Sequence, residues 1–159
     1  MKFICTDIGL SIEVKKSLID QLHQLGLKYY PKEYGGLLIG RYVDNNKTVL
    51  IEETVLPKQF KSSSFSFERN LNGLKRTLTS FFKKSPSLIY VGEWHTHPNG
   101  TPYPSMTDSS ALRTIVEHDE VFITNPVLLI IGINPTHYEL GFHVLYDNKI
   151  YQYEKELIQ

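Results

Sequence analysis

Near the N-terminus, apolar and polar residues alternate with a helical period over residues 12–25. Ser11 is a suitable N-cap and Gly26 a suitable stop signal, so the pattern predicts a helix between them. A second helical pattern covers residues 67–82, where leucine and phenylalanine side chains fall on one face. A third helix is predicted to begin at Ser105, a natural N-cap that apolar residues follow at helical spacing.

Shorter apolar runs, bounded by turn residues, predict strands. The run over residues 127–133 is continuously apolar, which is typical of a central strand. The polar, Ser-rich residues 58–66 predict a mobile loop instead. The other strands are predicted over residues 37–43 and 48–56 around a turn at 44–47, over 88–95, and over 139–146 and 149–153 around Asp147 and Asn148.

These elements follow one another in the order α, β, β, α, β, α, β, β, β, and we expect a mixed α/β fold with a β-sheet flanked by helices. With 159 residues, the chain is expected to form a single domain over residues 1–159.

The 17 Lys and Arg residues balance the 17 Asp and Glu residues, so no basic surplus favours nucleic acid binding. We expect no membrane association, because no apolar stretch is long enough for a transmembrane helix and no signal peptide pattern opens the chain. The single cysteine, Cys5, rules out an internal disulfide, fits a reducing cytoplasm and is expected to be a buried structural thiol.

The most specific chemistry lies at His95 and His97, which are followed closely by Ser105 and Asp108. Ligands two residues apart suit the end of a strand, where alternate side chains project from the same face and can reach one metal ion. Asp108 would come from the first turn of the predicted third helix. Two imidazoles and a carboxylate, with one coordination position left open, are a typical ligand set of a catalytic zinc site.

A family resemblance rests on three segments: Glu33, His-Thr-His-Pro at residues 95–98, and Ser-x-x-Asp at residues 105–108. Together they resemble the JAMM motif of the JAB1/MPN/Mov34 metalloproteases at every motif position. The resemblance runs from about Ser11 to about Tyr146, and the run Gly-Glu-Trp-His-Thr-His-Pro is similar to the prokaryotic JAB branch. It implies an MPN/JAB-like fold in which, as in cytidine deaminases, helices flank a mixed β-sheet.

The resemblance also implies roles for individual residues. His95, His97 and Asp108 would hold one zinc ion per chain, whose bound water would be the nucleophile. Glu33 would accept the proton of that water and deliver one to the leaving amine. Ser105 would donate a hydrogen bond to the oxyanion, in addition to capping its helix.

Alternation along residues 88–95 places Val91 and Glu93 on the face of the two histidines, and Trp94 on the opposite face, in the core. Glu93 is therefore a rival for the role of base. Its other interpretations are an acceptor for an imidazole N–H and a simply exposed carboxylate. The remaining histidines lack ligand spacing and are expected to be exposed or satisfied in the fold; they are His23, His118, His137 and His143.

The resemblance implies a zinc-dependent isopeptidase or peptidase that hydrolyses the bond at the C-terminus of a ubiquitin-like or similarly conjugated protein. The target could be a CD-NTase-type nucleotidyltransferase of an anti-phage operon, with E1- and E2-like partners. We expect the tail to end in a small residue, glycine in the ubiquitin-like case, and to lie near residues 58–66 and 99–103. Two alternatives stay open: a protease that processes a sulfur-carrier or ubiquitin-like precursor, and a non-catalytic MPN-type binding scaffold. A DNA-linked role, as in the related RadC domain, has no support from the charge.

Overall fold

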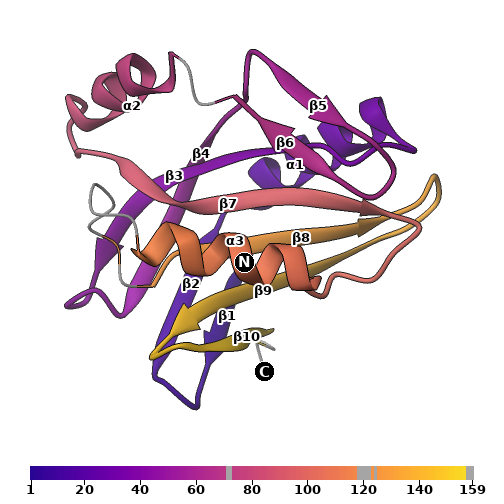
Figure 1. Ribbon diagram of the computed structural model, residues 1–159. Helices are drawn as coiled ribbons and strands as arrows, with labels where there is room; N and C mark the ends of the chain where they lie inside the picture. The colour runs from indigo at the N-terminus through magenta and orange to yellow at the C-terminus, as the bar shows by residue number, and fades with distance from the viewer. Residues whose placement is uncertain (71–72, 118–122, 124, 157–159) are drawn as a thin grey trace.

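The computed structural model describes residues 1–70, 73–117, 123 and 125–156. Its main sheet contains eight strands: β1 (Lys2–Cys5), β2 (Leu10–Val14), β3 (Gly35–Val43), β4 (Thr48–Val55), β7 (Ile89–Pro98), β8 (Val127–Ile133), β9 (Tyr138–Tyr146) and β10 (Lys149–Lys155). This sheet closes on itself in the order β1-β10-β9-β8-β7-β3-β4-β2 (Figure 1). The pairs β2–β4 and β7–β8 are parallel and the others antiparallel, so the sheet is mixed, as predicted.

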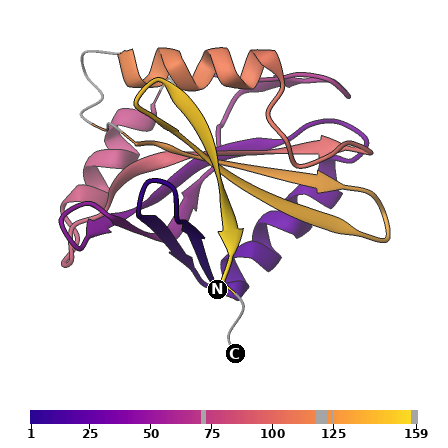
Figure 2. The ribbon, with the colours of Figure 1, turned by 90° about the horizontal axis from the view of Figure 1, so that it is seen from below.

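Helices lie on both sides of this sheet. α1 (Lys16–Tyr29) packs on one side and α3 (Met106–Glu117) on the other, as Figure 2 shows from below. α2 (Leu74–Phe82) covers a smaller cluster beside β3 and β7. None of the helices in the described part of the chain is long and apolar enough to span a membrane.

The parallel pair β7–β8 positions the chemistry of the protein. All seven residues of β8 are buried, which agrees with the continuously apolar run predicted for a central strand. Parallel strands need a long crossover connection, and α3 supplies it. The chain therefore leaves the C-terminal end of β7, turns, and enters α3 close to that end, which brings two separate segments of sequence together.

The prediction of a helix starting after Ser11 is wrong. Residues Leu10–Val14 form β2, which pairs with β1 and β4, and α1 begins only at Lys16. The apolar residues of this stretch also alternate with period two, and pairing on both edges favours the strand. Gly26 does not end α1. It lies inside the helix, where a Cβ atom would come within 2.7 Å of Thr96 Cγ2, so it allows α1 to approach β7 closely.

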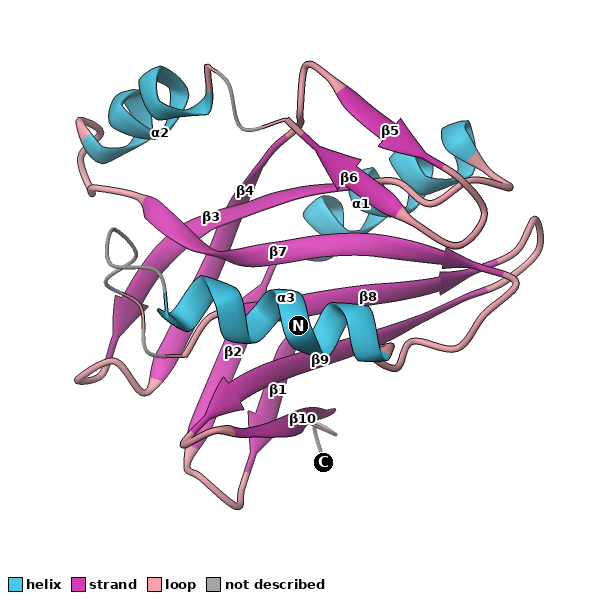
Figure 3. Ribbon diagram, viewed as in Figure 1, coloured by secondary structure: helices cyan, strands magenta, loops and turns pink. Residues whose placement is uncertain are grey.

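The segment predicted as a mobile loop followed by a long helix is a hairpin followed by a short helix. β5 (Phe60–Ser62) and β6 (Phe67–Arg69) pair as a separate two-stranded sheet, drawn in magenta in Figure 3. Among the described residues of the predicted helix, those of α2 in its second half are helical. The part of that prediction on residues 71–72, including Leu71, and the interpretation of His118 lie outside the described residues.

Other predictions from the pattern are confirmed. β3–β4 and β9–β10 are hairpins, and Asp147 and Asn148 both have positive φ, as the tight turn between β9 and β10 requires. Cys5 is buried and free, and Trp94 is only 1% exposed.

One face assignment in β7 is wrong because of a β-bulge. Leu38 pairs with Gly92 whereas Ile39 pairs with Tyr90, so Val91 is the extra residue. Val91 therefore turns into the main core with Trp94, away from Glu93 and the histidines. Gly92 is needed there: its φ is +155°, and a Cβ atom would lie 1.9 Å from Val127 O.

Candidate metal centre

The C-terminal half of β7 and the first turn of α3 bring the three predicted ligands together. His95 and His97 alternate along β7 and project from the same side of the strand. Asp108 lies in the first turn of α3, where a carboxylate is favoured by the helix dipole. One ligand atom from each of these three residues lies within 4.8 Å of the others.

The distances between these atoms fit a metal ion. His95 Nε2 lies 3.0 Å from His97 Nε2 and 3.1 Å from Asp108 Oδ1, and His97 Nε2 lies 3.4 Å from Asp108 Oδ2. Tetrahedral zinc with bonds of roughly 2.0–2.1 Å separates its ligand atoms by about 3.3 Å. The three separations, two of which run to different oxygens of the same carboxylate, are close to that value, and the donor set is one that zinc prefers.

The loop between β7 and α3 fixes the orientation of His97. The Nδ1–H of His97 donates a hydrogen bond to Thr101 O at 3.0 Å, which leaves the lone pair on Nε2 facing the other ligands. His143, only 2% exposed, donates from Nε2 to Pro102 O at 2.8 Å in the same loop. Gly141 leaves room for this loop, because a Cβ atom there would lie 2.0 Å from Pro102 O.

Ser105 and Asp108 cap α3 reciprocally. The backbone N–H of Asp108 donates to Ser105 Oγ at 3.2 Å, and the backbone N–H of Ser105 donates to Asp108 Oδ2 at 2.7 Å. This is a capping box with an aspartate in the position usually taken by glutamate. The Ser105 hydroxyl also donates to Asp108 Oδ2 at 2.6 Å. The N-cap predicted at Ser105 is therefore present, and the same contacts hold the Asp108 carboxylate beside the histidines.

The charges in the cluster support one another. Burial alone would raise the pKa of Asp108, but the hydrogen bonds that the imidazoles donate when protonated, their positive charge, and the hydrogen bond from Ser105 outweigh burial and hold this pKa well below its usual range. Burial lowers the pKa of His97, yet the hydrogen bond and the charge of Asp108 outweigh it and raise this pKa overall. Asp108 is thus ionised, and its negative charge favours a positive charge, on an imidazole or on a bound cation, at this cluster.

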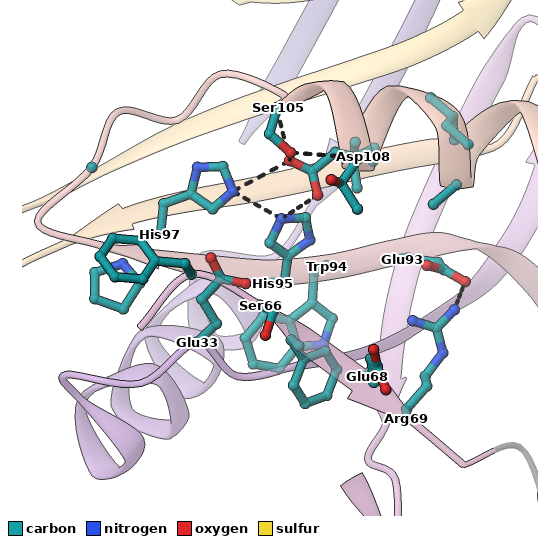
Figure 4. A pocket seen from close by; sticks show the side chains of 18 of the residues that line it. Glu33, Ser66, Glu68, Arg69, Glu93, Trp94, His95, His97, Ser105 and Asp108 are labelled. Atoms are coloured by element: carbon teal, nitrogen blue, oxygen red, sulfur yellow. Dashed lines mark hydrogen bonds and ion pairs between the residues drawn. The ribbon is translucent and has the colours of Figure 1, made fainter. Parts of the chain in front are cut away.

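Glu33 reaches this cluster from the segment between α1 and β3, far away in sequence. Its side chain points toward the two histidine rings (Figure 4). Burial raises the pKa of Glu33, and the nearby His95 and His97 offset only part of that rise. This carboxylate therefore has a higher proton affinity than an exposed glutamate, and it lines the same pocket as the two histidines.

Glu93 makes contacts that none of its three predicted interpretations included. Its carboxylate forms an ion pair with Arg69 of β6 and accepts a hydrogen bond from the Tyr90 hydroxyl at 3.2 Å. Its side chain is only 12% exposed, so it is neither a solvated carboxylate nor, in these contacts, a partner of an imidazole N–H. The bulge at Val91 places Tyr90 on the side of Glu93, which alternation alone could not reveal.

A pocket of about 500 Å³ extends from the three ligand residues. β7 forms its floor, the β5–β6 hairpin one wall and α3 the other (Figure 4). Of the segments expected to form a groove, residues 64–66 and residues 99 and 100 line it, whereas Tyr103 does not. Arg69 and the two serines that contact Glu33, Ser62 and Ser63, belong to no motif, so the sequence did not reveal them. The serines lie in the segment predicted as a loop, and Arg69 lies in the segment predicted as a helix.

Comparison with known proteins places this geometry in a family. Residues 15–142 match the family described as prokaryotic homologs of the JAB domain. A CD-NTase/cGAS isopeptidase from Enterobacter hormaechei is 35% identical over 126 residues, which cover 79% of this chain and 69% of that protein. A probable metalloprotease from Sinorhizobium fredii is 25% identical over 80% of this chain and 79% of its own length.

A solved structure agrees with the fold. The solution structure of a protein from Desulfitobacterium hafniense superposes with a TM-score of 0.62, at 18% identity, over 90% of each chain. The mixed α/β architecture expected from the sequence is thereby confirmed.

Proposed function

Because the chain belongs to the family of prokaryotic homologs of the JAB domain, we propose that it is a zinc-dependent isopeptidase that cuts the bond at the C-terminus of a conjugated protein. Its family and its relatives make it a JAMM-type hydrolase. The observation that carries the proposal is the convergence of His95, His97 and Asp108 to within 4.8 Å in a pocket that also contains Glu33.

His95, His97 and Asp108 would hold the metal ion, one per chain. A zinc ion with this ligand set supplies a Lewis acid that lowers the pKa of water from 15.7 to about 7. The hydrogen bond from His97 to Thr101 and the capping contacts of Asp108 keep the ligand atoms in place before any metal arrives. This arrangement reduces the cost of ordering the site on binding.

Glu33 would act as the proton shuttle. Its raised pKa allows the carboxylate to take up a proton during the attack and to return it to the leaving amine. Ser105 lines the pocket beside Asp108, which suits a donor to the oxyanion. Its hydroxyl proton is directed at Asp108 Oδ2 in this structure, so this role requires the hydroxyl to rotate toward the substrate.

The pocket suits an extended tail. Among the described strands, β6 pairs with β5 alone, so its other edge can pair with a peptide that enters the pocket. Relatives named CD-NTase/cGAS isopeptidases favour a conjugated CD-NTase-type nucleotidyltransferase as the target, in antiviral defence and in the cytoplasm, where the free Cys5 fits. A target with a ubiquitin-like tail would undergo the same hydrolysis, and E1- and E2-like enzymes would then be the partners that form the conjugate. Trimming of a precursor is the alternative that uses the same chemistry on an unconjugated tail.

The test uses reporters fused to the C-terminal tail of a CD-NTase-type nucleotidyltransferase or of a ubiquitin-like protein. Wild-type protein should release the reporter, and both a zinc chelator and Glu33→Ala should abolish release. Glu139→Ala, which removes a carboxylate at an exposed site, is the control and should cleave normally. Cleavage that persists in the presence of the chelator would contradict the proposal of a metalloprotease. A zinc-loaded, folded wild-type protein that cleaves no tail would favour the binding scaffold.

A further inference from the structure

The β5–β6 hairpin is attached to the body of the protein directly beneath Glu33. Phe60 of β5 and Phe67 of β6 pack edge-on against Tyr34, with ring centroids 5.2 and 5.7 Å away. Tyr34 in turn stacks on Tyr29 of α1 at 3.8 Å. Because Tyr34 directly follows Glu33 in the chain, this aromatic cluster anchors the hairpin and the segment that carries Glu33 as one packed unit.

Hydrogen bonds then fix the main chain of Glu33 to the hairpin. The Glu33 N–H donates to Ser63 O at 2.8 Å, and the Ser62 hydroxyl donates to Glu33 O. On the other side, Tyr34 N–H donates to Thr96 Oγ1 at 3.0 Å, and Thr96 N–H donates to Tyr34 O at 2.8 Å. Thr96 lies between the two histidine ligands. The backbone of Glu33 is therefore held between the hairpin and the strand that bears the ligands.

The same hairpin forms a wall of the pocket. Residues 64–69 line it, and the ion pair between Arg69 and Glu93 ties the end of β6 to the pocket floor. Phe65, at the turn of the hairpin, is 92% exposed and also lines the pocket. The hairpin therefore has two functions. Residues 64–69 line the space where a tail would lie, and Ser62 and Ser63 hold the Glu33 backbone.

We infer that Ser62 is a positioning residue for Glu33 and that the hairpin sets the place of the proton shuttle. This inference rests on the proposed function, since it concerns how Glu33 is aimed at the reacting groups. Ser62 touches neither substrate nor metal; it acts through the Glu33 carbonyl. Fixing both peptide groups of a residue removes backbone rotations that would otherwise move its carboxylate, and a displacement of about 1 Å can cost on the order of 100-fold in rate.

The experiment compares Ser62→Ala, Ser62→Thr and Ser87→Ala with the wild-type protein. Ser62→Thr keeps the hydroxyl. Ser87→Ala is a matched control, because the Ser87 hydroxyl also donates to a main-chain carbonyl, Phe82 O at 2.7 Å, and neither residue lines the pocket. For each protein, zinc content, kcat and KM on a cleaved tail reporter, and NMR-detected hydrogen exchange of the Glu33 amide are measured.

Ser62→Ala should keep its zinc and its KM while kcat falls by roughly 10- to 100-fold. The Glu33 amide keeps its bond to Ser63 O. It should still exchange roughly 2- to 10-fold faster, because losing the neighbouring bond from Ser62 to Glu33 O makes local opening of this segment easier by about the free energy of one typical hydrogen bond. Ser62→Thr and Ser87→Ala should resemble wild type in every measurement. A Ser62→Ala protein with wild-type kcat, or one that loses zinc and melts far below wild type, would overturn the inference. If the wild-type protein cleaves no tail, the proposed function fails, and unchanged exchange of the Glu33 amide in Ser62→Ala would separately refute the positioning role.

Discussion

At the scale of single residues, Asp108 combines two roles that usually fall to different side chains. Its carboxylate faces both imidazoles, and one of its oxygens accepts the hydrogen bonds that close the capping box with Ser105. Asp108→Asn should remove the anionic ligand while its backbone N–H still caps α3 through Ser105. We expect zinc content to fall from about one per chain to near zero, with the helix content unchanged. Elemental analysis and circular dichroism check this, and Asp20→Asn on the exposed side of α1 should stay zinc-loaded.

Substitution of Glu33 should have a different effect from substitution of Asp108, because activity should be lost while zinc stays bound. Glu33→Gln keeps the size and the packing of the side chain but removes the basic oxygen, so zinc should stay bound while kcat falls by about 100- to 10,000-fold. Such a protein should also capture the uncleaved conjugate, which a pull-down would detect. Glu93→Gln is the informative comparison, because Glu93 was the rival base and is instead paired with Arg69. If Glu93→Gln is inactive and Glu33→Gln is active, the two roles are reversed.

At the scale of elements, the loop between His97 and Ser105 depends on a residue outside the motif. His143 of β9 is buried and donates to Pro102 O, and burial lowers the pKa of His143, so the ring is a neutral donor. His143→Leu should leave that carbonyl without its donor and lower the free energy of unfolding by about 1–3 kcal/mol. Zinc affinity should weaken as well, since His97 is oriented by the same loop. Denaturant unfolding and chelator competition measure both effects; His137→Leu, at an exposed position, should change neither. A His143→Leu protein as stable as wild type would show that the loop does not need this bond.

The helices and strands also show which parts of the fold could be predicted from the sequence alone. β8 was predicted over its full length, because burial on both faces leaves an apolar run that only a central strand explains. The three predicted ligand residues do lie together in the structure, because alternation and a capping signal act over a few residues. The residues of β2, β5 and β6 were misassigned, because each is short and is held by pairing with distant strands or by aromatic packing. The contacts of Glu93 and Ser62 depended on those elements and on a bulge, so no local pattern could predict them.

At the scale of the whole molecule, a metal ion at this site would connect parts that are far apart in the chain. His95 and His97 belong to β7 of the closed sheet, and Asp108 belongs to α3, which packs on the sheet. A ligand that binds only the folded state stabilises it by about 2.7 kcal/mol at 100 times its Kd. For a domain of this size each kcal/mol raises Tm by about 2–4 °C. Zinc in that excess should therefore raise Tm of the metal-free protein by about 5–10 °C, and a chelator should reverse the shift. Calorimetry of wild type and Asp108→Asn decides the matter: an equal shift in both proteins would place the stabilising metal elsewhere, because the variant lacks the one ligand that joins α3 to the sheet.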